Sequence, residues 1–177
     1  MIAEAVVILR NRNREGRTGR IFSYNLYRMK QPRAARKTAS RKNLCFACGP
    51  DNPGGMHLKF VSDPSGRRYV SRFRLNKRYT GPPGHCHGGI IATILDDAMS
   101  KLNKLRDQPA ATARMTVEYL KPVPLHKPLR VESREISKRG RRLTRIAEIF
   151  DEQGTVLARG RGVFVLLNAG HAFRKRR

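Results

Sequence analysis

The chain has 177 residues and carries 38 Lys and Arg against 13 Asp and Glu, which gives a formal net charge of +25. Its 39% hydrophobic content is too high for a chain that is disordered throughout, and its longest apolar runs are too short to span a bilayer. The three cysteines favour free thiols in a reducing compartment, which we take as the cytoplasm, over a secreted disulfide framework. We therefore expect a soluble globular domain whose positive charge attracts a polyanionic partner.

The basic residues divide the chain into three segments. Residues 1–42 carry twelve Lys and Arg and two Glu, in a composition typical of a disordered arm. Residues 169–177 end in four consecutive basic residues and form a second tail. The globular domain is expected at residues 43–168, which keep a net charge of +11.

The N-terminal arm does not fit a secretory signal, because its apolar run is short and no cleavage site follows. Glu4 and Glu15 weaken the match to a mitochondrial presequence without excluding it. Met29 opens a Lys/Arg-rich run and is an alternative start of the protein, which would place residues 1–28 outside it.

The pattern between the tails predicts two strands, one helix and then four strands. Apolar residues three and four positions apart after His87-Gly88-Gly89 predict a helix of about 17 residues. The expected strands are 56–61 and 69–75 before the helix, and 111–120, 129–137, 143–150 and 156–167 after it. Short glycine-containing turns predict hairpins, which exclude a parallel doubly wound sheet. We expect an α+β fold in which an antiparallel sheet of about five to six strands wraps one long central helix.

The start of this helix carries the most chemical information. Gly88 and Gly89 leave backbone N–H groups at the positive end of the helix dipole, a site suited to a developing oxyanion. Asp96 follows Gly89 by about two helical turns, so its carboxylate should project on the same side. The positions of Asp96 and Asp97 are explained equally well if the two form a solvated polar edge of the helix. Adjacent helical residues point about 100° apart, so only one of the two can face a substrate.

Three motifs occur in a specific order. They are Cys45 to Pro53, then His87-Gly88-Gly89 followed by Asp96, then the strand from Thr112 to Pro122. Together, over about residues 43–167, they resemble the PaaI-like group of hotdog-fold acyl-CoA thioesterases. The resemblance implies a homodimer or homotetramer with each active site at a subunit interface. It also implies hydrolysis of an acyl-CoA to a free acid and coenzyme A without a cofactor, with a role in fatty acid metabolism.

The resemblance also implies roles for single residues. Asp96 would be the catalytic carboxylate, acting as general base or as nucleophile. The N–H of Gly88 would polarise the thioester carbonyl, with His87 shaping the pocket beside it. Thr112, from the partner subunit, would hold the attacking water. Gly81 stands where some relatives have a polar Asn or Gln, so part of the support for the carbonyl would be missing.

Coenzyme A brings several phosphate charges, which a basic domain can attract. Beside Gly89 at the helix start, the candidate substrate-binding residues are arginines on turn and strand positions: Arg139, Arg141, Arg142 and Arg161. A solvated surface explains any single one of them as well. The candidates for the acyl pocket are Ile90, Ile91, Met99 and Met115, which fit a core equally well. Tyr119 and Phe164 are expected to be core aromatics of the sheet.

The cysteines leave two interpretations open. Cys45-x-x-Cys48, with Cys86 between two histidines, is compatible with zinc. A lone Cys-x-x-Cys pair is a weak signal, so we favour free thiols packed near the first strand and expect no metal.

Two functions from different classes remain. The first is an acyl-CoA thioesterase, in which Asp96→Asn abolishes turnover. The second is a nucleic-acid-binding protein that reuses the fold and contacts phosphates through its basic arms, with an affinity that falls steeply with salt. Deletion of residues 1–42 separates them, since only the nucleic-acid binder should lose its function.

Overall fold

The computed structural model describes residues 42–105 and 107–167. The disordered arm expected at residues 1–42 and the tail expected at residues 169–177 lie outside this part of the chain, except for Lys42. None of the helices in the described residues combines the length and the hydropathy that a membrane span needs.

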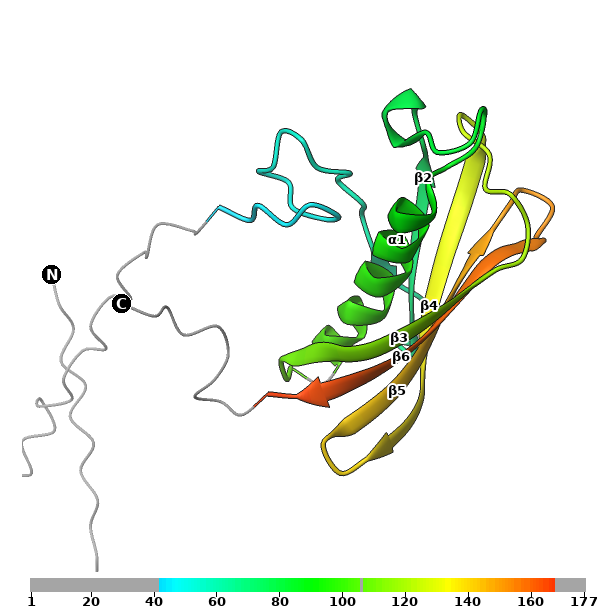
Figure 1. Cartoon of the computed structure of the whole chain (residues 1–177). Helices are drawn as coiled ribbons and strands as arrows, with labels where there is room; N and C mark the ends of the chain where they lie inside the picture. The colour runs from blue at the N-terminus through cyan, green and yellow to red at the C-terminus, as the bar shows by residue number, and fades with distance from the viewer. Residues whose placement is uncertain (1–41, 106, 168–177) are drawn as a thin grey trace, which may run out of the picture. The chain divides into compact units, whose positions relative to one another are not determined.

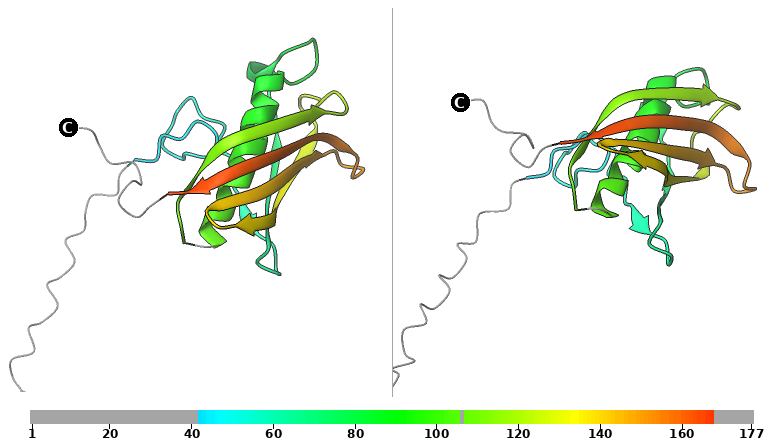
Figure 2. Two further views of the ribbon diagram at one scale, coloured as in Figure 1. Left: turned by 60° about the horizontal axis from the view of Figure 1, so that its bottom comes forward. Right: turned by 90° about the horizontal axis from the view of Figure 1, so that it is seen from below.

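The strands of the described residues pair antiparallel into one six-stranded sheet, in the order β1-β2-β4-β5-β6-β3. Figure 1 shows α1 lying against one face of this sheet, and Figure 2 shows the sheet curving around the helix. The elements in chain order are β1 (Val61–Ser62), β2 (Arg68–Arg74), the 3₁₀ helix η1 (Lys77–Tyr79), α1 (Gly88–Lys101), the 3₁₀ helix η2 (Leu102–Leu105), β3 (Ala110–Tyr119), β4 (Pro128–Arg139), β5 (Arg142–Phe150) and β6 (Val156–Leu166). The predicted α+β hotdog architecture is confirmed.

The predicted strand at residues 56–61 is wrong for most of its length, because only Val61 joins the sheet. The Met56 N–H donates to the Phe46 carbonyl at 2.7 Å, and the Leu58 N–H donates to the Ala47 carbonyl at 2.9 Å. This segment therefore pairs with the turn that contains the first two cysteines. Of the apolar residues that suggested a strand, Leu58 is buried in the core, and Met56 and Phe60 pack against it.

The other elements agree with the sequence pattern to within two residues at most ends. The exception is the helix, which ends as an α-helix at Lys101 and continues as η2. At this end the buried Arg145 guanidinium donates from Nη1 to the Met99 carbonyl at 3.0 Å and to Asn103 Oδ1 at 2.6 Å. The last carbonyls of α1 therefore have a fixed charged donor, which holds the C-terminal end of the helix in place.

The apolar stripe of α1 faces the sheet and forms the centre of the core. Its fully buried residues are Ile94, Leu95, Ala98 and Met99. Opposite them β6 has two glycines, and a Cβ built on Gly160 would lie 3.1 Å from Leu95 Cβ. Because these two glycines have no side chains, α1 packs close to the sheet. This close packing fixes the rotation of the helix about its axis.

Candidate functional site

Helix α1 begins at two glycines and is capped by His87. The Gly89 N–H donates to His87 Nδ1 at 3.0 Å, and the His87 carbonyl accepts from the N–H groups of Ile90 and Ile91. Among the described residues the N–H of Gly88 has no acceptor. Of the two donors predicted at the helix start, the one on Gly89 is used by the cap, and the one on Gly88 is available to polarise a carbonyl.

The position of this cap depends on Gly81. The His87 N–H donates to the Tyr79 carbonyl at 2.9 Å, which holds the histidine backbone against the preceding loop. A Cβ built on Gly81 would lie only 2.7 Å from His87 Cα. Any side chain at residue 81 would therefore displace the cap, so glycine at this position is a packing requirement of the helix start.

Asp96 lies on the side of α1 that faces the edge strand β3. The Thr112 hydroxyl donates to Asp96 Oδ1 at 2.7 Å within the same chain. Asp96 is half-buried and Thr112 is exposed, so the carboxylate sits at the margin of the core. This hydrogen bond fixes one carboxylate oxygen and leaves the second for another partner. The resemblance gave Thr112 a role across a subunit interface, and that role stays a prediction.

The other end of β3 reaches the start of α1. The Tyr119 hydroxyl donates to the Gly88 carbonyl at 3.2 Å. Its side chain is not in the core as predicted, because the residue is 57% exposed, whereas Phe164 is fully buried as expected. Strand alternation places both aromatics on the helix side of the sheet, but β3 is the edge strand and Tyr119 lies at its open end. The sequence pattern does not indicate this exposure, so Tyr119 was not among the predicted site residues.

A pocket of about 410 Å³ lies at the start of α1. It is lined by Pro82, His85, Cys86, Gly88, Ile91, Tyr119, Leu120, Lys121, Pro122 and Val123. Of the four candidates for an acyl pocket, Ile91 lines it, Met99 is buried in the core, and Ile90 and Met115 are partly buried against the core. Asp96 is not among the lining residues. The pocket and the carboxylate therefore occupy opposite ends of the contact between α1 and β3.

The four predicted arginines do not gather around Asp96. Arg139 and Arg142 are exposed where β4 turns into β5. Arg141 in the same turn donates from Nε and Nη2 to the Leu166 carbonyl, at 3.1 and 2.7 Å. Arg161 is exposed on β6, where it pairs in register with Thr116 of β3. Arg161 thus presents positive charge beside β3, and Arg141 secures the end of β6.

A second cavity, of about 870 Å³, lies elsewhere. It is lined by residues of β2, the start of β4 and the turn before β6: Arg72, Phe73, Arg74, Pro128, Leu129, Arg130, Asp151, Glu152, Gln153 and Gly154. None of the predicted site residues lines it, so we place the candidate site at the contact between α1 and β3.

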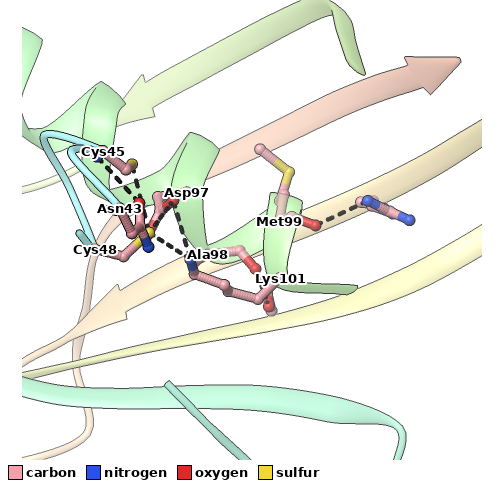
Figure 3. Close-up of polar contacts among 9 residues, drawn as sticks. Asn43, Cys45, Cys48, Asp97, Ala98, Met99 and Lys101 are labelled. Carbon is pink, nitrogen blue, oxygen red and sulfur yellow. Dashed lines mark hydrogen bonds and ion pairs between the residues drawn. The ribbon is translucent and has the colours of Figure 1, made fainter. Parts of the chain in front are cut away.

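The second carboxylate of the helix, Asp97, faces the segment that contains the cysteines (Figure 3). Cys48 Sγ lies 3.3 Å from Asp97 Oδ1 and 3.4 Å from Cys45 Sγ. The Lys101 ammonium contacts Cys48 Sγ and lies 3.4 Å from Asp97 Oδ1. We call these four residues the thiol cluster. The two adjacent aspartates thus have separate partners, as the 100° angle between neighbouring helical residues requires.

The two thiols of the cluster differ in acidity. Burial works against ionisation of Cys45, but the N–H groups of Cys48 and Ala47 and the Cys48 thiol outweigh it and lower the pKa of Cys45. Burial and the Asp97 charge raise the pKa of Cys48 to about 11, although the Lys101 ammonium favours its thiolate. Burial alone raises the pKa of Cys86 to about 11.

The ligand atoms of Cys45, Cys48 and Asp97 lie within 4.8 Å of one another, a spacing that a metal ion could bridge. The Lys101 ammonium already lies against two of them and supplies the positive charge that a metal would bring. We therefore assign no metal to this cluster.

The helix and three strands of the sheet match one protein superfamily. Residues 83–158, which include α1 and most of the sheet, match the Thioesterase superfamily. The solved structure of protein RHA08564, a thioesterase superfamily protein, is 29% identical, with a TM-score of 0.66 over 70% of this chain and 60% of that one. The structure of Escherichia coli PaaI is 18% identical, with a TM-score of 0.57 over 63% of this chain and 80% of that one, and shows the fold alone. The match of residues 83–158 and the fold of these structures confirm the predicted resemblance to PaaI-like hotdog thioesterases.

Curated relatives carry more specific names. The acyl-coenzyme A thioesterase THEM4 of Xenopus laevis is 28% identical over 119 residues, which are 67% of this chain and 54% of that protein. The human acyl-coenzyme A thioesterase THEM5 is 29% identical over 115 residues, which are 64% of this chain and 46% of that protein. An uncharacterized mitochondrial membrane protein, FMP10 of Saccharomyces cerevisiae, is 26% identical over 64% of this chain and 49% of its own length. The chain spans about half the length of these relatives.

Proposed function

We propose that this protein hydrolyses an acyl-CoA thioester to a free carboxylic acid and coenzyme A. The observation that carries the proposal is the Asp96 carboxylate, held by Thr112 on a helix whose first N–H group is unpaired within the described chain. The names of the curated relatives support acyl-CoA as the substrate class. So does a Bacillus halodurans structure with CoA, 26% identical, with a TM-score of 0.56 over 63% of this chain and 74% of that one.

Each residue contributes one part of the chemistry. Asp96 either removes a proton from water as the water attacks the thioester carbon, or attacks that carbon itself to form an anhydride that water then opens. The Gly88 N–H stabilises the oxyanion that forms on the carbonyl oxygen. Gly88 and Asp96 of one chain are eight residues, or about 12 Å, apart on the same helix, so the Gly88 that serves a given Asp96 would come from a second copy of the chain. The thiolate of coenzyme A leaves readily, so these groups carry out the reaction with no further cofactor.

A second copy of the chain would complete this site. Strand β3 is the sheet edge next to α1, and seven of its ten residues are exposed. Tyr119 and Leu120, both exposed, continue this surface into the pocket. A long edge strand with no further partner among the described residues favours pairing with another chain. We therefore expect a homodimer, or a tetramer built from it, in which the partner covers β3 and closes the pocket. Sedimentation of the purified protein checks this.

The exposed arginines of this region suit the phosphates of coenzyme A. Arg139 and Arg142 lie in one turn, and Arg161 lies on β6 next to β3. Guanidinium groups bind phosphate oxygens in a bidentate geometry. Replacing Arg139 and Arg142 together by Ser should raise KM for acyl-CoA and leave hydrolysis of a short pantetheine thioester unchanged.

A panel of short, long and aromatic acyl-CoA substrates tests the activity, with release of the free thiol as the readout. We expect turnover of at least one class, and retention of that turnover when sheared nucleic acid is added in excess. In heavy-oxygen water, label in the Asp96 peptide after one turnover marks the nucleophile route. Hydrolysis of long-chain substrates would support a role in fatty acid metabolism. No hydrolysis of any substrate by a folded dimer would refute the proposal.

The compartment is a separate part of the proposal. Free thiols favour a reducing compartment, and the cytoplasm is our expectation. Imaging of the protein expressed at its native level with a C-terminal tag checks it, and an organellar signal would correct it.

A further inference from the structure

The thiol cluster lies on a different face of α1 from Asp96 and has no part in the proposed hydrolysis. We propose that Cys45 and Cys48 form a dithiol–disulfide exchange site, in which Cys45 attacks a low-molecular-weight disulfide such as oxidised glutathione and Cys48 then displaces the bound thiol.

The segment before the first strand is built to hold the two sulfurs together. The Gly49 N–H donates to the Cys45 carbonyl at 2.9 Å, which closes the turn around Phe46 and Ala47. A Cβ built on Gly49 would lie 2.4 Å from the Asn43 carbonyl oxygen and 2.5 Å from the Cys45 nitrogen, so only glycine fits this turn. The sulfurs are 3.4 Å apart, and a disulfide of about 2.05 Å needs a small closing movement of the side chains.

The two cysteines are placed for different steps. Cys45 is exposed, and its neighbours Leu44 and Phe46 are also exposed, so a small disulfide can reach its sulfur. The N–H groups and the thiol that lower the pKa of Cys45 also increase the fraction of thiolate, the form that attacks a disulfide. Cys48 is half-buried behind it and stays protonated, so it is the second nucleophile and not the first.

Asp97 and Lys101 serve the second step. The Cys48 thiol lies within reach of Asp97 Oδ1, and Asp97 Oδ2 is buried with no hydrogen-bond partner in the described part of the chain. Asp97 therefore has a free acceptor oxygen beside the proton that Cys48 must lose. Lys101 contacts Cys48 Sγ and stabilises the negative charge that develops on it (Figure 3).

The reaction transfers two electrons from the protein to the small disulfide. The Cys45 thiolate forms a bond with one sulfur of oxidised glutathione, the S–S bond breaks, and a glutathione thiolate leaves and takes a proton from water. The Cys48 proton passes to Asp97 and then to solvent. The Cys48 sulfur bonds to Cys45, and the second glutathione leaves as thiolate. The products are one protein disulfide and two molecules of reduced glutathione.

The same atoms favour a dithiol over a metal site. A dication held by the two sulfurs and Asp97 would lie close to the Lys101 ammonium, which is 3.4 Å from Asp97 Oδ1 and in contact with Cys48. Two cations at this separation repel each other strongly in a half-buried site.

The test uses the full reduced chain, equilibrated with mixtures of reduced and oxidised glutathione, alkylated and mapped by mass spectrometry. We expect a Cys45–Cys48 disulfide and no glutathione on Cys86. The Cys48→Ser variant should stop with glutathione on Cys45, and Cys45→Ser should lower the rate of reaction by about tenfold or more, because the remaining thiols have a small thiolate fraction. Cys86→Ser is the matched control and should behave as the wild type.

A second measurement tests whether Asp97 takes part in the second step or only supports the structure. In Asp97→Asn the first step should keep its rate, while closure of the disulfide slows by about tenfold or more, so that glutathione accumulates on Cys45. The proposal is overturned if wild-type Cys45 keeps its glutathione, or if Cys48 or Cys86 reacts first. It is also overturned if the reduced chain takes up one Zn²⁺ that protects both thiols from alkylation.

Discussion

The two adjacent carboxylates of α1 have contrasting surroundings. Asp96 lies at an open sheet edge and accepts one hydrogen bond from Thr112. Asp97 is enclosed by Cys48 and Lys101, and one of its oxygens is buried without a partner in the described residues. The same side chain, one residue further along a helix, thus meets a different environment. A helix that packs on a curved sheet with one face has two flanks left, and in this chain each flank carries its own chemistry.

Exchange of each carboxylate for an amide gives the largest difference. Asp96→Asn keeps the size of the side chain but removes the base or nucleophile, so kcat for acyl-CoA should fall by about 10³-fold or more. Asp97→Asn, its matched control, should lower kcat by less than about tenfold. The readout is thiol release at saturating substrate, with circular dichroism to confirm folding. Equal losses in both variants would show that the two flanks are not independent.

The helix and the place of Asp96 on it could be predicted because the signals are local. The three- and four-residue spacing of apolar residues and the two glycines at the start define the helix within a short window. The hairpins likewise follow from short turns. What the sequence could not supply is contact between distant residues: Thr112 with Asp96, and above all Cys48 with Asp97, 49 positions away.

The errors have the same cause. The segment at residues 56–61 has the composition of a strand, but the N–H groups of Met56 and Leu58 donate to carbonyls of the cysteine turn. The local sequence pattern does not predict this pairing. Tyr119 alternates correctly in β3, but its exposure depends on β3 being the sheet edge. The hydrogen bond from the Gly89 N–H to the His87 ring depends on the conformation of that side chain, which the periodicity of the sequence does not predict.

The Thr112 hydroxyl provides the next largest effect on the Asp96 flank. Thr112→Val has nearly the same shape and loses the hydrogen bond to a charged carboxylate, which is worth about 1.5–3 kcal/mol. We expect kcat to fall by about tenfold to a hundredfold with thiol reactivity unchanged. Thr112→Ser keeps the hydroxyl and should restore most of the activity. A valine variant with wild-type kcat would contradict a role for this hydroxyl.

Two glycines allow each flank to be disturbed alone. A Cβ added to Gly81 would lie too close to His87 Cα, and a Cβ added to Gly49 would lie too close to the backbone of Asn43 and Cys45. Each Gly→Ala change should lower the free energy of unfolding by about 1–3 kcal/mol, because backbone must move. Gly81→Ala should mainly impair hydrolysis, and Gly49→Ala should mainly slow formation of the Cys45–Cys48 disulfide. Urea denaturation measures the stability loss, and the reverse pattern of activities would be evidence against the division.

The smallest expected effect is the dependence of stability on alkaline pH that comes from Cys48. Burial raises the pKa of this thiol from an ordinary 9.0 to about 11, despite the opposing effect of Lys101. The unfolded chain therefore loses this proton first as the pH rises, and the stabilisation is complete below about pH 9 and lost toward about pH 11. Because the thiol is only half-buried, the change should be small. Urea midpoints of the wild type and Cys48→Ser at about pH 8 and about pH 10 measure it. The wild type should lose more stability between the two pH values than the variant. Cys86 titrates in both proteins, so its contribution cancels. Parallel losses would mean that the Asp97 flank does not hold Cys48 in its protonated form.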